Sequence, residues 1–247
     1  MGSILVNRMI ANTIKQIRKK VHLVYSVQKN INSYYKAKVH PFHLLWVNPK
    51  DIKVGLGLKS PRRLVEVRDG DWDLEAVDLF ELDPRFRSLV THFIEGVPWK
   101  ETELYHSVLQ LIKIKGTHYH KSSNEDELLK YLKKVDKLYS DIKKYGYQTQ
   151  RELLGNGLRG FVRRMKYPDV LEMLEINIDI GRNGELIFVD GIHRLSISYA
   201  LNIKKVPVYV FIRHTRWQEY RDYVYANSKN NPEKLHHHPD LEYLINK

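Results

Sequence analysis

The amino-acid sequence predicts a mixed α/β fold, in which a small mixed sheet is flanked by helices and preceded by a basic amphipathic helix. Short apolar runs bounded by turn residues alternate with longer segments whose apolar residues recur every three or four positions. A hydrophobic content of 43% over 247 residues is enough for a sizeable core. The chain has no cysteine, no signal-peptide pattern and no apolar run near the length of about 18 residues that a membrane span needs. These features favour a cytoplasmic protein without disulfides.

Residues 1–40 are expected to form a basic arm, and residues 41–247 the main domain. The first 50 residues hold nine lysines and arginines and no acid, so only +3 of the net charge of +12 falls on the remainder (12 − 9 = 3). Apolar side chains recur every three or four positions from Ile10 to Ile31, with Gln28 at one step, which predicts a helix with a single apolar stripe. This helix could pack on its own domain, pair with a second copy in a homodimer, or lie through residues 8–38 on nucleic acid or, peripherally, on an anionic membrane surface.

Two strands and an acidic turn are expected after the arm. The stretch HLLWVNPKDIKV, residues 43–54, predicts a strand that ends in a turn at Asn48 and Pro49. A second strand is predicted at Leu64–Val67, before an Asp-Gly turn. The aspartates that follow alternate along the chain as in a calcium loop: Asp69, Asp71 and Asp73. Because the glycine and glutamate of an EF-hand are missing downstream, we expect an acidic turn rather than a metal site.

The middle of the chain is predicted to be helical. Residues 83–116 have a helical pattern that a Gly-Val-Pro sequence interrupts. The clearest helix begins after Ser123 or Asn124 as N-cap, carries acids in its first turn and ends at Gly146. Three glycines then predict a flexible loop: Gly155, Gly157 and Gly160.

A hairpin, a helix and a strand are predicted next. Alternating isoleucines from Ile176 to Ile180, an Arg-Asn-Gly turn and the apolar run Leu186–Val189 are typical of a hairpin. A helix from His193 to about Leu201 and a strand over residues 206–212 complete this unit. The remaining tail is expected to hold at most two short helices.

The junction between the hairpin and its helix concentrates residues suited to bind an anion. A strand end that opens a helix presents backbone N–H groups and the positive end of the helix dipole, and Gly191 leaves this backbone uncovered. His193 and Arg194 add donors in the first turn, so a phosphate is the natural ligand. Asp190, last on the strand, is placed to hold a metal ion or to accept a proton from a hydroxyl. In the alternative, Asp190 is an N-cap, His193 is structural and Arg194 is a surface charge.

The same residues carry a family resemblance. The stretch FVDGIHRLSISYALNIKKVPVYV, residues 188–210, resembles the core signature of the ParB/sulfiredoxin-like superfamily: a strand, Asp-Gly-x-His/Arg-Arg, a small-residue helix, a lysine-containing turn and a Val-Pro-Val strand. VDKLYSDIKKYGYQ is similar to the helix and glycine that precede the hairpin in that family, and HLLWVNPKDI is similar to its opening strand. The resemblance covers residues 128–213 and, more faintly, 41–55, and it implies a ParB/sulfiredoxin-like core.

The superfamily hosts several chemistries, and the sequence discriminates among them. Sulfiredoxins carry a catalytic cysteine where this chain has Ile192, and a chain without cysteine cannot perform that reduction. Partition-type ParB proteins bind CTP and add a DNA-binding helix-turn-helix domain, for which the 34 residues after Arg213 (247 − 213 = 34) are too few. The free-serine kinases carry Asp-Gly-His-His-Arg, and the sequence Asp-Gly-Ile-His-Arg is closest to this class.

The resemblance implies a nucleotide-dependent kinase that phosphorylates a hydroxyl of an amino acid or sugar, with ATP or ADP, or CTP, and Mg²⁺. Gly191, Ile192, His193 and Arg194 would hold the nucleotide phosphates, and Asp190 would act as the catalytic base or hold the metal, with His193 assisting transfer. Three further candidates precede the hairpin: Glu152 as the family's additional catalytic glutamate, and Gln148 and Gln150 as contacts to the nucleotide or acceptor. Glu152 also fits a solvated helix acid. A nucleotide-binding, nucleic-acid-binding protein is the alternative function, and a nuclease is a third.

Overall fold

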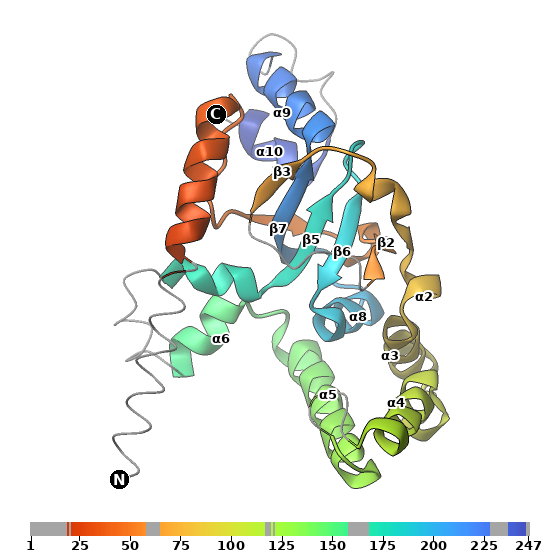
Figure 1. Ribbon diagram of the computed structural model, residues 1–247. Helices are drawn as coiled ribbons and strands as arrows, with labels where there is room; N and C mark the ends of the chain where they lie inside the picture. The colour runs from red at the N-terminus through yellow and green to blue at the C-terminus, as the bar shows by residue number, and fades with distance from the viewer. Residues whose placement is uncertain are drawn as a thin grey trace, which may run out of the picture.

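The computed structural model describes residues 19, 21–57, 65–116, 120, 122–157, 168–227 and 237–245, and within them it is a mixed α/β fold built on one mixed sheet (Figure 1). The sheet has seven strands among these residues, in the order β1-β7-β5-β6-β2-β4, with β3 paired to the other end of β7. The pairs β7–β5, β6–β2 and β3–β7 are parallel, and β1–β7, β5–β6 and β2–β4 are antiparallel. The strands are β1 Leu44–Val47, β2 Val54–Gly55, β3 Glu66–Arg68, β4 Val77–Asp78, β5 Ile176–Ile180, β6 Leu186–Asp190 and β7 Val206–His214.

Helices cover the sheet and extend from it. The α-helices are α2 Leu79–Leu82, α3 Pro84–Glu95, α4 Glu103–Lys115, α5 Glu125–Tyr145, α6 Gln150–Gly157, α8 Ile192–Ala200, α9 Thr215–Asn227 and α10 Pro239–Ile245, together with the helical arm residues 21–34. Short 3-10 turns lie at η1 Pro49–Asp51, η3 Trp72–Glu75, η4 Trp99–Glu101 and η5 Pro168–Leu174. In Figure 1, α8 lies beside β6, whereas α9 and α10 lie at the opposite end of the sheet.

Alternation along the central strand β7 supplies two cores. Val208 and Val210 face the larger core with α8, α3 and part of α5, while Tyr209 and Phe211 face a smaller core on the other side. Because both faces are covered, all nine residues of β7 are buried. Burial of this kind, at about 25 cal/mol per Å² of apolar surface, is the main stabilising contribution to the fold.

The arm helix packs on its own sheet. Val21 and Val24 are fully buried, and they join Phe42, Tyr209 and Phe211 in the smaller core. Of the alternatives for this helix, packing on its own domain therefore describes residues 21–34. Ile10 and the rest of the stripe up to residue 18 lie outside the described residues.

Several sequence predictions are confirmed. Asn124 caps α5 by accepting from the N–H of Glu127, and Gly146 ends it with a φ of 77°. The predicted hairpin is β5–β6, and the predicted strand before Asn48 is β1. The strand expected at Leu64–Val67 is observed as β3, which spans Glu66–Arg68. Leu64 lies outside the described part of the chain.

Two expectations are wrong. The glycine spacing predicts a flexible loop, but Gly155 and Gly157 belong to helix α6, while Gly160 lies outside the described residues. The tail does contain two helices, yet α9 is 13 residues long rather than short. A buried ion cluster attaches the tail to the sheet: Asp240 on α10 accepts from Arg213 at 2.9 and 2.7 Å and from the indole of Trp217 at 3.0 Å. Burial alone would raise the pKa of Asp240, but Arg213 and Arg221 hold it well below its usual range.

Candidate functional site

The strand-to-helix junction predicted from the sequence is present between β6 and α8. Gly191 adopts a φ of 97°, in the left-handed region that favours glycine. A Cβ at this position would lie 3.1 Å from the Cα of Ile176 on the neighbouring strand, so a larger residue would be both strained and crowded. The exposed Asp190 turns back over the junction and accepts the Gly191 N–H through Oδ1 at 2.8 Å.

The first turn of α8 has the polarity that suits an anion. Its N-cap residue is Gly191, which has no side chain to accept an N–H of the helix, and its first turn contains no acid. Apart from the Asp190 carboxylate, which accepts the Gly191 N–H, no acid or N-cap side chain among the described residues satisfies the N–H groups at this positive end of the helix dipole. The Ile192 side chain is only 6% exposed and belongs to the larger core, so this residue can offer a ligand only its backbone.

His193 is a neutral imidazole at physiological pH. Burial, with help from the charges of His120 and Arg85, lowers its pKa to about 4. Its Nε2 lies 3.0 Å from the hydroxyl of Tyr131 on α5, which orients the ring. The ring of His120 stacks on Tyr131 at a centroid distance of 4.3 Å and meets the His193 ring edge-on at 5.7 Å.

Charged side chains from α3 complete this cluster. Arg85 acts electrostatically on both His193 and His120, as does Asp190, and Asp83 acts on His193. Asp83 is the N-cap of α3 and pairs with Arg85 at 2.6 Å. We call Asp83, Arg85, His120, Tyr131, Asp190 and His193 the junction cluster. It brings together residues from α3, α5, β6 and α8 and from position 120.

Arg194 is engaged in an internal ion pair beside the junction, with its Nη2 3.6 Å from where a Cβ on Gly191 would lie. Its Nη1 donates to Glu175 Oε2 at 2.9 Å and to the hydroxyl of Tyr147 at 3.2 Å, and its Nη2 donates to the carbonyl of Leu174 at 2.5 Å. The Glu175 side chain is 0% exposed, and burial raises its pKa despite the opposing effect of Arg194. In this arrangement Arg194 ties α8 to the segment before β5.

Glu152 forms a capping box at the start of α6. Its Oε2 accepts the backbone N–H of Thr149 at 2.7 Å and the Thr149 hydroxyl at 2.9 Å, while the Glu152 N–H donates to Thr149 Oγ1 at 3.1 Å. This reciprocal pattern is a helix-start motif. Gln150 donates its backbone N–H to Glu175 at 2.5 Å, and Gln148 is exposed. These interactions associate Glu152 and Gln150 with Glu175 and Arg194 rather than with the junction cluster.

The described part of the chain contains no group of three or more histidine, aspartate or glutamate side chains arranged to hold a metal ion. Asp190 is nevertheless a suitable ligand for Mg²⁺, because this ion is commonly held by one or two carboxylates together with substrate phosphates and water. The acidic turn at Asp71 and Asp73 is occupied by Arg182, which contacts them at 2.7 and 2.8 Å.

Comparison with protein-family models, with curated proteins and with solved structures finds no match for this chain. Within the described residues, every helix is too short or too polar to cross a bilayer. The interpretation of the site therefore depends on its geometry.

Sequence reasoning missed four members of the junction cluster: Asp83, Arg85, His120 and Tyr131. Tyr131 lies three residues after the buried Leu128 of α5 and appears in the sequence as one more aromatic beside an apolar stripe. No spacing links it to His193, 62 residues later. The one available signal was the pair of histidines in Thr-His-Tyr-His just before the α5 N-cap.

Proposed function

We propose that this protein is a nucleotide-dependent phosphotransferase of ParB/sulfiredoxin-like fold, acting on a hydroxyl of a small molecule such as an amino acid or sugar. The observation that carries the proposal is the junction itself, where the glycine-opened N-terminus of α8 lies beside an exposed carboxylate and a neutral histidine. The order hairpin, helix and strand, with α8 against the larger core, agrees with the resemblance found in the sequence.

The phosphates of ATP, ADP or CTP would lie against the backbone N–H groups of Ile192 and His193, beside Gly191, whose own N–H donates to Asp190. Here a helix N-terminus favours negative charge. Arg194 is 18% exposed and held by the buried Glu175, whereas Arg85, although paired with Asp83, is 47% exposed, so we assign the cationic contact to Arg85. An arginine is suited to this role because its planar fork binds two phosphate oxygens together.

Asp190 would receive the proton of the acceptor hydroxyl. The acceptor oxygen forms a bond to the terminal phosphorus as the bond from phosphorus to the bridging oxygen breaks, and that oxygen leaves with the nucleotide. Mg²⁺, when bound to the phosphates, would neutralise the charge on the leaving oxygen. His193 has a pKa too low for an efficient base at neutral pH, so its role is to position the acceptor or phosphate through its second nitrogen.

The proposal is tested by nucleotide turnover with a panel of hydroxyl compounds. We expect release of ADP from ATP, or of the corresponding product from ADP or CTP, only when an acceptor and Mg²⁺ are present. Asp190→Asn should lower kcat by a factor on the order of 100 or more, typical for loss of acid–base catalysis, without weakening nucleotide binding to the same extent. Glu152→Gln is the matched control, and its turnover should remain close to that of the wild type.

Nucleotide binding without turnover against any acceptor would instead favour a nucleotide-responsive binding protein using the same junction. Absence of nucleotide binding by calorimetry, with a folded protein, would remove both possibilities.

A further inference from the structure

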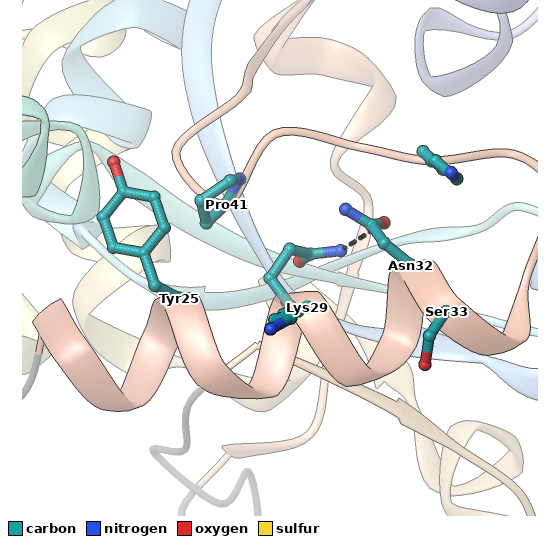
Figure 2. Close-up of a pocket in the computed structure, with 7 residues that line it drawn as sticks. Tyr25, Lys29, Asn32, Ser33 and Pro41 are labelled. Atoms are coloured by element: carbon teal, nitrogen blue, oxygen red, sulfur yellow. Dashed lines mark hydrogen bonds between the residues drawn. The ribbon is translucent and has the colours of Figure 1, made fainter.

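A second site is formed away from the junction, where the arm helix meets the chain that follows it. A recess of about 440 Å³ lies between them, a volume within the range of small-ligand sites. Figure 2 shows Lys29 and Ser33 on the helix, Pro41 on the crossing segment and Asn32 turned toward that segment. The lining residues are Tyr25, Gln28, Lys29, Asn32, Ser33, Lys38 and Pro41, and we call this site the arm recess.

The wall of the arm recess is held in place by hydrogen bonds. Asn32 donates to the carbonyl of Val39 at 3.1 Å and accepts the Val39 N–H at 3.2 Å, so its amide fixes the crossing segment against the helix. Asp222 of α9 anchors the same segment by accepting the N–H groups of Lys36 and Ala37 at 3.0 and 2.7 Å. The recess is therefore a fixed feature of the fold.

A buried polar atom at the recess lacks a partner. Gln28 is 2% exposed and donates through Nε2 to Asn32 Oδ1 at 3.1 Å. Its Oε1 is buried and accepts no hydrogen bond from the described residues. A buried unsatisfied acceptor of this kind costs about 1–3 kcal/mol, so a small rearrangement that brings a ligand donor to it would be favourable.

The charge around the recess is positive. Lys29 and Lys38 are exposed at its rim, and the first 50 residues contain no acid. Lys19 is also exposed, ten residues before Lys29, which corresponds to about 15 Å along a helix. The distance between these lysines is longer than one phosphate group, so together they suit a ligand with several phosphates. Acids lie near Tyr35 and Lys36, at the end of the crossing segment away from Pro41. Burial, Tyr34, Glu219 and Asp222 together raise the pKa of Tyr35. We therefore assign no phosphate contact to Lys36.

The geometry excludes two other occupants for this part of the arm. Membrane association of an amphipathic helix requires a free apolar face, and a second copy would require the same face. Val21 and Val24 are instead buried in the smaller core against the sheet. The surface that remains carries lysines together with aromatic side chains, including Tyr25 in the recess and Tyr34, which is 83% exposed.

We propose that the arm recess binds single-stranded nucleic acid, with one base in the recess against Tyr25 and the flanking phosphates at Lys29 and Lys38. Lysines that follow the backbone and aromatic rings that stack on unpaired bases are the two components of single-strand binding surfaces. This site is independent of the junction cluster and of the proposed phosphotransfer.

The test is fluorescence anisotropy of a labelled oligothymidylate with the full-length protein. The double variant Lys29→Ala/Lys38→Ala should weaken binding roughly tenfold at low salt and reduce the slope of log K against log salt by about 1.4, because each phosphate contact in a single strand contributes about 0.7. Lys133→Ala/Lys134→Ala, which removes two exposed lysines from α5, is the matched control and should change neither quantity.

A second pair of variants tests the stacking. Tyr25→Phe should retain affinity, whereas Tyr25→Leu should lose about tenfold, within the range for one base on an aromatic ring. The proposal would be overturned if Lys29→Ala/Lys38→Ala and Lys133→Ala/Lys134→Ala lost oligonucleotide affinity equally. Unchanged binding in Lys29→Ala/Lys38→Ala would also overturn it. So would binding to anionic vesicles without binding to the oligonucleotide. Asp190→Asn should leave oligonucleotide binding unchanged, which separates this site from the phosphotransfer proposal.

Discussion

Asp179 on β5 should make the stability of the protein fall as the pH rises through the weakly acidic range. Its side chain is 0% exposed and accepts the Ile212 N–H through Oδ1 at 3.0 Å. Among the described residues, Oδ2 has no hydrogen-bond partner. Asp179 lies between Ile178 and Ile180, where the pairing of β5 with β7 shifts in register. Burial raises its pKa from 3.8 to about 7, although the Ile212 N–H and Arg68 oppose the rise.

The size and sign of the effect follow from this pKa. Between about pH 4 and pH 7 the folded state retains a proton that the unfolded state has released, so stability decreases as the pH rises. A difference of about 3 units at about 1.36 kcal/mol per unit corresponds to a change on the order of 4 kcal/mol. Asp179→Asn keeps the shape but cannot ionise, so its stability lacks this dependence.

The assay is urea unfolding of the wild type and Asp179→Asn across this pH range. Between about pH 4 and pH 8, the free energy of unfolding of the variant should gain about 4 kcal/mol relative to the wild type. Any constant offset, such as the cost of about 1–3 kcal/mol for an unpaired buried amide, does not alter that trend. A difference between the two proteins that stays constant with pH would refute the reasoning.

Three further substitutions test other parts of the structure. Gly191→Ala should lower the free energy of unfolding by about 1–2 kcal/mol because of its positive φ, and unchanged stability in denaturant would argue against the left-handed conformation. Arg194→Ala should lower the free energy of unfolding by about 3–5 kcal/mol, because it leaves the buried Glu175 without its ion-pair partner. Arg194→Met combined with Glu175→Gln should recover most of this stability. A small effect of Arg194→Ala alone would contradict the ion pair. Glu152→Ala should cost about 1 kcal/mol in urea unfolding with little change in turnover, whereas a large loss of turnover would assign Glu152 to catalysis.

Local sequence signals predicted the elements around the junction well. The Arg-Asn-Gly turn, alternating isoleucines and the Asp-Gly step depend on residues close in sequence, and the hairpin and α8 form as those signals indicate. The α6 region was misjudged although Thr149 and Glu152 form a capping box that the sequence shows, because the three glycines outweighed this signal. The bond from Gln150 to Glu175, 25 residues away, is not visible in the sequence.

The role of individual side chains at the junction required tertiary structure. Arg194 looked available for an anion because nothing in the sequence links it to Glu175, 19 residues earlier. Likewise, Tyr131 and Arg85 come from helices whose packing against α8 no short motif encodes. Backbone conformation could be predicted from turn chemistry, whereas side-chain partners across the fold could not.

The most direct test of the central claim is the structure of the protein crystallised with Mg²⁺ and a non-hydrolysable ATP analogue. The account predicts phosphate oxygens within hydrogen-bond distance of the backbone nitrogens of Ile192 and His193, beside Gly191 and Asp190. A nucleotide bound elsewhere, with these nitrogens contacting only water or protein, would contradict it.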